Sequence, residues 1–312
     1  MTVLEPSGIL LLNKPPGLTS FQSLDLVKKI FSTPKVGHAG TLDKFASGLL
    51  TVLVGRAVKL SPWFSGCDKH YEGIIRFGVE TDTLDPEGLP IAQGPVPSRE
   101  VLEEVLPHFR GDILQAPPVY SAIHLGGKRA SQRAREGESV EMEKRPVTVY
   151  ALDLRSYDPP LASVHVHCSK GTYIRSLARD IALAAGSRGH LQALTRTQAA
   201  GFCLSQALDF LSLSSEGFSP IEGLRSLDPG VFEALGIPVV FVDPPVAEKI
   251  IRGMPLQRLI KENGLVLPLD SRISVVGLFR SGVGTGKGGD FLGIIEQKAG
   301  GAWSYGYVYA RA

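Results

Sequence analysis

The chain has 312 residues, enough to bury a full hydrophobic core, and its 33 Lys and Arg nearly balance its 31 Asp and Glu, giving a formal net charge of +2. This balance gives no bulk electrostatic sign of a nucleic-acid partner. Three cysteines without a CxxC spacing exclude a disulfide framework and a zinc knuckle and fit a reducing cytoplasm, and the apolar run at residues 9–12 is too short for a signal-peptide core or a membrane span.

The first elements predicted along the chain are a buried strand at residues 8–13 and a helix capped by Thr19 or Ser20. The expected apolar face of the helix carries Phe21, Leu24, Val27 and Ile30 or Phe31.

A glycine-hinged loop follows this helix and ends at Asp43, before strand-like sequence at residues 48–54. Gly37 and Gly40 can both take φ > 0 and let backbone or a bulky ligand approach closely. Such a loop is a common way to present a reactive carboxylate, although an Asp in a Gly-rich turn can also simply satisfy its own backbone.

Further elements are expected as strands at residues 71–79, 147–156 and 162–168 and as helices at residues 98–109 and 172–185. The last helix has a clear apolar stripe and a natural stop at Gly186. Long antiparallel strands with helices set against them indicate an α+β fold.

Residues 126–144 include Lys128, Arg129, Arg133 and Arg135 and almost no large apolar side chain, so this segment predicts either a mobile basic arm or a solvated helix-loop excursion. Residues 198–236 become rich in Ser, Gly and Pro. A large domain is therefore expected at residues 1–236, followed by a small domain at 237–312 with a strand and short helix at 239–256 and strands at 275–279, 291–296 and 304–309.

Three weaker motifs have ordinary explanations. The GxGxxG spacing at residues 284–289 lies between two strand-like segments, so it predicts a hairpin tip instead of a dinucleotide or phosphate loop. His165, His167 and Cys168 follow strand alternation, with no convincing ligand cluster beside them, and no metal is expected. Asp82 and Asp85 fail the calcium-loop spacing because Gln93 stands where the terminal Glu is required.

Local charge is more informative than the total. Residues 1–60 carry seven Lys or Arg against three acids, a surplus of four around the candidate loop. Phosphate contacts favour such a patch, and an ordinary solvated surface gives the same surplus.

Seven motifs in a fixed order resemble the TruB family of tRNA pseudouridine synthases over about residues 8–197. They are LNKPPGLTS at 12–20, GTLD at 40–43, GRAVKL at 55–60, KHY at 69–71, TDTLDPEG at 81–88, QAPPVYSA at 115–122 and CSKGTYIRS at 168–176. The resemblance implies a pseudouridine synthase fold with a mixed, largely antiparallel central sheet flanked by helices. It also implies a basic insertion at about 124–146 that closes over RNA, and the small domain resembles a PUA-like β-barrel.

The activity implied by the resemblance is isomerisation of uridine 55 in the T loop of tRNA, by base flipping and a catalytic Asp. It requires neither an organic cofactor nor a metal. The expected partner is the T arm of tRNA, with no obligate protein partner, and a cytoplasmic monomer is expected. Two other functions remain open: a non-catalytic tRNA-binding chaperone, and a subunit of an RNA-guided pseudouridine synthase.

For Arg175, the helix-dipole argument and the family resemblance both predict a nearby anion. With Thr172 as the expected N-cap it lies in the first helical turn, where the macrodipole disfavours a cation unless an anion is near. The resemblance supplies that anion by pairing Arg175 with the catalytic Asp43, which would keep the carboxylate ionised and positioned. An Arg that reaches solvent or a phosphate is the alternative.

The remaining site residues rest on the resemblance alone. Tyr71 is implied to stack on the target uracil and to be catalytic with Asp43 and Arg175. Substrate-binding roles are implied for His38, which can also be a turn residue, for Asp85, and for Tyr173, which can also be a core contact. Structural roles are implied for Lys14 and Pro15.

Five positions depart from the usual family pattern, and one of them bears on the site, since Lys44 could compete with Arg175 for the Asp43 carboxylate. The positions are Ala39, Lys44-Phe45, His124 and Ser131.

Overall fold

The structure is a computed structural model that describes residues 6–125, 127–138, 140–215, 217–263, 265–268, 270, 272–282 and 289–309, with backbone alone for residues 124, 125, 129 and 263. Residues 284–288 of the GxGxxG motif lie outside the described residues.

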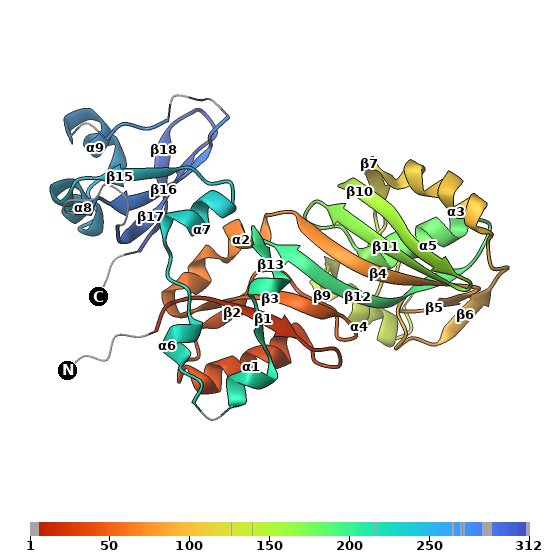
Figure 1. The fold of residues 1–312 in the computed structure, drawn as a ribbon. Helices are drawn as coiled ribbons and strands as arrows, with labels where there is room; N and C mark the ends of the chain where they lie inside the picture. The colour runs from red at the N-terminus through yellow and green to blue at the C-terminus, as the bar shows by residue number, and fades with distance from the viewer. Residues whose placement is uncertain are drawn as a thin grey trace.

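A ten-stranded mixed sheet forms the large part of the molecule (Figure 1). Its main strands lie in the order β14-β1-β3-β12-β4-β11-β10-β7, and only the β1:β14 and β3:β12 pairs are parallel. The predicted α+β fold with a largely antiparallel sheet is confirmed. The strands are β1 (Gly8–Lys14), β2 (Val36–His38), β3 (Ser47–Val54), β4 (Lys69–Phe77), β7 (Gly111–Gln115), β10 (Arg145–Asp158), β11 (Leu161–Cys168), β12 (Gly189–Ala199), β13 (Phe202–Cys203) and β14 (Leu208–Asp209).

Strands β1 and β3 are almost wholly apolar because both of their faces are covered. On one face Leu10, Leu12 and Leu50 join a core with α1 (Ser20–Ile30), α3 (Arg99–Val105) and α5 (Ile174–Ala184). On the other face Leu11 and Leu53 pack in a second cluster. This two-sided burial explains why the N-terminal segment reads as a continuous apolar run.

Helix α1 begins as predicted, with Thr19 as N-cap in a capping box with Gln22. One member of its expected apolar face is wrong, because Phe21 is 64% exposed and packs under the Lys28 ammonium instead. Ser20 and Ser23 occupy the buried face at that end of the helix. Ser20 is buried because its hydroxyl is hydrogen-bonded to the backbone of Leu42 in the loop that follows.

Helix α5 is also confirmed, with a corrected start. Its N-cap is Tyr173, whereas the Thr172 hydroxyl donates to the Ser169 carbonyl at 3.0 Å. Arg175 therefore remains in the first turn, as expected. The helix ends at Ala185 and Gly186, where φ is +66°.

The C-terminal part forms a separate four-stranded sheet in the order β15-β16-β17-β18, covered by two helices and sharing an apolar core with them. A barrel was expected. Among the described residues, the strand pairings form an open sheet in this order, and no pairing joins β15 to β18. The helix α9 was missed from the sequence. These elements are β15 (Val239–Val242), α8 (Pro244–Ile251), α9 (Leu256–Asn263), β16 (Val275–Arg280), β17 (Phe291–Gln297) and β18 (Trp303–Val308).

The two sheets are joined through the second apolar cluster, which unites Leu11 and Phe64 with Phe232 of α7 (Pro229–Ala234) and Phe279 of β16. Polar contacts border it: the Trp63 indole N–H donates to Glu296 at 3.1 Å. A boundary near residues 236 and 237 stays a proposal, because one continuous core crosses it.

Shorter elements complete the described chain. They are η1 (Gly55–Leu60), α2 (Ser61–Ser65), β5 (Val79–Thr81), β6 (Pro90–Gln93), η2 (Leu106–Phe109), β8 (His124–Leu125), β9 (Lys128–Arg129), α4 (Ala130–Arg135), η3 (Leu204–Gln206), η4 (Leu211–Ser214) and α6 (Pro220–Gly223).

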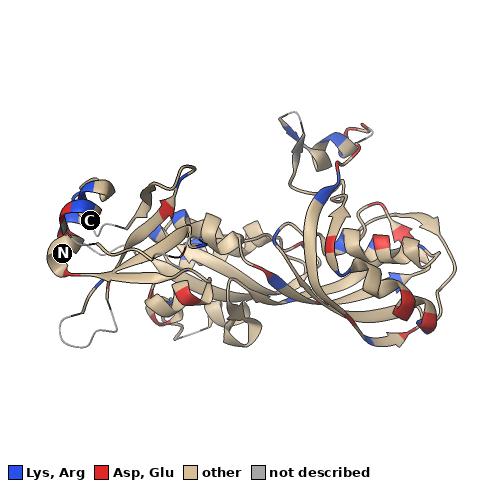
Figure 2. Cartoon of the chain, turned by 90° about the horizontal axis from the view of Figure 1, so that it is seen from above, with Lys and Arg blue, Asp and Glu red and all other residues tan. Residues whose placement is uncertain are grey.

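The predicted basic arm contains β8, β9 and α4, and it stands away from the body of the molecule (Figure 2). Its charge is partly balanced within the arm, since Lys128 pairs with Glu136 at 3.1 Å and Arg133 with Glu138 at 2.6 Å. Mobility of the arm stays a prediction.

Gly48, at the start of β3, should not tolerate a side chain. Its φ is +104°, and an added Cβ would lie 2.4 Å from the Arg196 carbonyl oxygen. Gly48→Ala is expected to lower the free energy of unfolding by about 1–3 kcal/mol from the backbone conformation and by a further ~1–3 kcal/mol from the clash. Urea unfolding measures the loss.

Gly111→Ala is the matched control, because Gly111 has φ +83° with no atom within 4 Å of the added Cβ. It should show the conformational cost alone. Equal losses for the two variants would contradict the proposed clash.

Candidate active site

The loop that carries Asp43 is held by hydrogen bonds on both sides. The Ala39 N–H donates to the Thr51 carbonyl at 2.9 Å, and the Ser20 hydroxyl accepts from the Leu42 N–H at 2.7 Å and donates to the Leu42 carbonyl at 2.9 Å. Gly40 has φ +101°, as expected. Gly37 does not need a positive φ, because it lies in β2 paired with Leu53 of β3.

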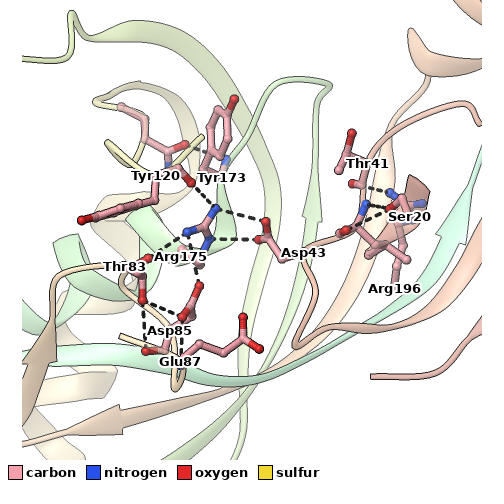
Figure 3. A network of polar contacts seen from close by, with 12 residues as sticks. Ser20, Thr41, Asp43, Thr83, Asp85, Glu87, Tyr120, Tyr173, Arg175 and Arg196 are labelled. Atoms are coloured by element: carbon pink, nitrogen blue, oxygen red, sulfur yellow. Dashed lines mark hydrogen bonds and ion pairs between the residues drawn. The ribbon is translucent and has the colours of Figure 1, made fainter. Parts of the chain in front are cut away.

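Arg175 and Asp43 form a bidentate ion pair, as predicted (Figure 3). The guanidinium Nε lies 2.9 Å from Asp43 Oδ2, and Nη2 lies 3.1 Å from Oδ1. The Arg175 side chain is 5% exposed and that of Asp43 is 36% exposed. The cation is therefore the buried member of the pair, and the carboxylate is the accessible one.

The other three N–H groups of Arg175 also have partners. Nη1 donates to the Thr83 carbonyl at 2.8 Å and approaches Asp85 Oδ2 at 3.4 Å, while Nη2 donates to the Tyr120 carbonyl at 3.0 Å. Since a guanidinium has five N–H donors, all of them are used. The guanidinium is fixed in orientation, and it fixes the carboxylate in turn.

Asp43 faces a cavity of about 470 Å³, a size typical of small-molecule sites. Tyr71 lines it from β4, and burial raises the pKa of the Tyr71 phenol, which favours its neutral form. The wall is built from the loop, β4, β12, the start of α5 and the arm: Gly40, Thr41, Leu42, Asp43, Ser65, Lys69, Tyr71, Tyr120, Ser121, Ala122, Ser131, Arg135, Gly171, Thr172, Tyr173, Ile174, Arg175, Leu194 and Arg196.

Tyr173 lines the cavity, so of its two expected positions it occupies the one in the pocket. Asp85 lies behind Arg175 and does not line the cavity; it is 6% exposed and accepts from the Thr83 hydroxyl at 2.6 Å and the Glu87 N–H at 3.1 Å. Burial is the main reason that the Asp85 pKa is raised, and Arg175 opposes that shift.

His38 lies in β2 and is not part of the cavity wall. Its Nδ1 is buried with no hydrogen-bond partner among the described residues, and burial lowers the pKa of its imidazole. The structure thus brings Asp43, Tyr71, Arg175 and Tyr173 together and leaves His38 apart.

Lys14 and Pro15 support the neighbouring backbone. The Lys14 side chain is fully buried, and its ammonium donates to the carbonyls of Pro15 and Leu18 at 2.8 Å each. Burial lowers the Lys14 pKa to about 8, although nearby Asp43 acts in the opposite direction.

Lys44 does not compete with Arg175 for Asp43. Its ammonium bonds to Glu87 at 2.6 Å.

Three cationic residues of the cavity wall were not identified as site residues from the sequence, namely Arg196, Lys69 and Arg135, the last of which was expected only as part of the basic arm. Lys69 donates to the carbonyls of Ser65 and Cys67, and burial lowers its pKa. Arg196 is fully buried in β12. Arg196 could have been found from the sequence as a lone Arg inside an otherwise strand-like, partly apolar segment.

The histidines noted in the sequence lie on the opposite face of β4 and β11 from Tyr71. His70 stacks on His167 with ring centroids 3.9 Å apart, and His165 Nδ1 lies 2.9 Å from Glu72. Within the described parts of the chain, no group of three or more His, Cys, Asp or Glu has the arrangement to hold a metal ion. The described helices also include none long and apolar enough to cross a membrane.

Replacement of Arg175 by Lys should be strongly destabilising. Lysine keeps the charge but cannot reproduce five directed donors, so buried acceptors are left unpaired, at a cost of roughly 1–3 kcal/mol each. We expect Arg175→Lys to lower the free energy of unfolding by about 2–5 kcal/mol, measured by urea titration.

Arg99→Lys is the matched control, since Arg99 pairs with Glu103 at 2.8 Å but both side chains are more than half exposed. It should change stability by less than about 0.5 kcal/mol. Similar small effects at both positions would show that the buried network contributes little.

Known proteins resemble this chain in sequence. A family model described as TruB family pseudouridylate synthase (N terminal domain) matches residues 28–174. The tRNA pseudouridine synthase B of Borreliella burgdorferi is 45% identical over 225 residues, covering 71% of this chain and 80% of the relative. The protein of the same name from Caldanaerobacter subterraneus subsp. tengcongensis is 39% identical over 275 residues, covering 87% of this chain and 94% of the relative.

Solved structures resemble it in fold. A chain of the archaeal box H/ACA sRNP Nop10-Cbf5 complex has a TM-score of 0.69 and 19% identity, covering 97% of this chain and 86% of that chain. A chain of a Cbf5-Nop10-Gar1 complex has a TM-score of 0.68 and 21% identity, with 97% and 85% covered. At these identities the likeness shows the fold alone.

Proposed function

Because this chain belongs to the TruB family of pseudouridylate synthases and is therefore an isomerase, we propose that it converts uridine 55 in the T loop of tRNA to pseudouridine. The observation that carries the proposal is the accessible Asp43 carboxylate, fixed by Arg175 at the wall of a cavity that also contains the Tyr71 ring. The name shared by the relatives supports tRNA as the substrate.

The reaction breaks the bond between C1′ and N1, turns the uracil and joins C1′ to C5. The proton on C5 is lost and N1 gains one, so there is no net redox change, and neither a cofactor nor a metal is required. Asp43 is the proposed nucleophile or electrostatic partner of bond cleavage. Its fork with Arg175 holds both carboxylate oxygens in place before the substrate arrives, which reduces the reorganisation needed in the transition state.

The target base must leave its folded loop to reach this carboxylate. Extruding a nucleotide costs a few kcal/mol, which stacking on an aromatic surface can offset. We assign that surface to Tyr71, whose ring lines the cavity, and assign Tyr173 to the adjoining wall. Asp85 then acts through Arg175, since it lies behind the guanidinium.

The arm is proposed to close over the T arm of tRNA. Ser131 and Arg135 of α4 already line the cavity, so a small shift of the arm would change access to Asp43. We propose that the enzyme works as a cytoplasmic monomer without an obligate protein partner.

Asp43→Asn should abolish product formation while leaving tRNA binding intact. The amide keeps the shape of the carboxylate but loses its charge and nucleophilicity, so the rate should fall by more than about a thousandfold. Phosphate contacts elsewhere dominate affinity, and the Kd should change by less than about threefold. The measurement is pseudouridine mapping at single-nucleotide resolution on an unmodified tRNA transcript.

Asp25→Asn is the control, because Asp25 is an exposed carboxylate that pairs with Lys28 across one helical turn. It should retain wild-type yield. Equal product from Asp43→Asn and wild type would refute the assignment of Asp43, and product at another uridine would refute the assignment of position 55.

Tyr71→Phe and Tyr71→Leu separate stacking from proton handling. Phe keeps the ring, so a stacking role alone predicts nearly wild-type single-turnover rates. Leu removes the ring and should slow the reaction by roughly 5- to 150-fold, the value of one base stack. A large loss for Phe would instead assign the chemical role to the phenol hydroxyl.

A further inference from the structure

Arg196 is the largest fully buried side chain among the described residues, and it is a cation without an ion pair there. Burying an unpaired charge costs several kcal/mol unless hydrogen bonds offset it, whereas an apolar side chain of similar volume would avoid the cost. Stability therefore gives little reason for an Arg at this position. Its place in the wall of the Asp43 cavity suggests a functional reason.

The Arg196 guanidinium lies beside the Tyr71 phenol and donates to three backbone carbonyls from two segments. Nε donates to Leu49 at 2.8 Å, Nη1 to Thr41 at 3.3 Å and Nη2 to Gly40 at 3.1 Å. Figure 3 shows the Arg196 side chain directed at the loop beside Thr41 and Ser20. One guanidinium thus connects β12 both to β3 and to the loop that carries Asp43.

The sheet makes only a short connection between β3 and β12. Strands β3 and β12 are paired only at Ser47 with Thr195 and at Gly48 with Arg196. Beyond that point the Arg196 side chain replaces the missing strand pairing. Gly48 allows the close approach, since no side chain could fit against the Arg196 backbone there.

Within the loop, the other anchors do not duplicate Arg196. Thr51 holds Ala39 and Ser20 holds Leu42, but the carbonyls of Gly40 and Thr41 are held by Arg196. These two residues lie directly before Leu42 and Asp43, and Gly40 has a φ of +101° that an unanchored loop need not keep.

We propose that Arg196 is a positioning residue of the active site, which fixes the backbone at residues 40 and 41 so that the Asp43 carboxylate meets the extruded nucleotide in register. Arg175 orients the side chain of Asp43, and Arg196 fixes the position of the loop backbone that carries Asp43. The inference rests on the proposed function, because it concerns the reaction assigned to Asp43. A misplacement of about 1 Å at a reacting group can cost on the order of 100-fold in rate.

The test compares Arg196→Met, which removes all three donors, with Arg196→Lys, which keeps the charge but cannot reach three carbonyls. Single-turnover rates and Kd are measured with an unmodified tRNA transcript well below the unfolding temperature. Amide hydrogen exchange is measured on the free protein. We expect both variants to lose about 100-fold in rate with Kd within threefold, and amides at residues 39–46 to exchange at least tenfold faster while those of α5 keep their wild-type rates.

Leu152→Ala is the control for lost stability, because Leu152 is a fully buried core residue of β10. It should be destabilised yet keep the wild-type rate. An equal rate loss in Leu152→Ala, unchanged loop exchange in the Arg196 variants, or a wild-type rate in Arg196→Lys would each overturn the positioning role.

If Arg196→Met does not fold, the rate and exchange of Arg196→Lys decide alone. If wild-type protein forms no pseudouridine, the proposed function fails. The exchange experiment still decides whether Arg196 anchors the loop.

Discussion

The structure of the site depends on one buried guanidinium that has no free donor. Arg175 contacts Asp43, Asp85 and two carbonyls, and these groups lie between 55 and 132 residues before it in the chain. A fork of this kind is directional, so it fixes orientation as well as charge. Its position in the first turn of α5 is unfavourable to a cation, and the two carboxylates beside it remove the conflict. The helix, the loop and the TDTLDPEG turn are therefore held in one geometry.

Buried lysine and arginine side chains support the backbone around this ion pair. Lys14, Lys69 and Arg196 are buried, and their hydrogen bonds go to backbone carbonyls of loops and strand ends. Such contacts leave the cavity wall positively charged and the acidic group rigid.

Much of this arrangement could be predicted from the sequence. Strands β1, β3, β4, β10 and β11, the N-cap of α1 and the Asp43–Arg175 pair were predicted from periodicity, cap chemistry and the ordered motifs, whereas β7 and β12 were missed. Phe21 was misplaced because burial of Ser20 depends on a contact with Leu42 that no helical pattern encodes. Arg196 was overlooked because its partners are backbone atoms, which leave no mark on residue identity. The cap of α5 was shifted by one residue for a similar reason, since Thr172 bonds backward to Ser169.

Successive side chains of strand β4 lie on opposite faces of the sheet, and only one face borders the cavity. Lys69 and Tyr71 point into the cavity, while His70 and Glu72 belong to the far side, next to His165 and His167. A shift of one residue in the register of β4 would exchange the two sets and place an imidazole where the phenol belongs. Side chains on the far side can therefore change without altering the cavity, whereas the register that keeps Tyr71 beside Asp43 cannot.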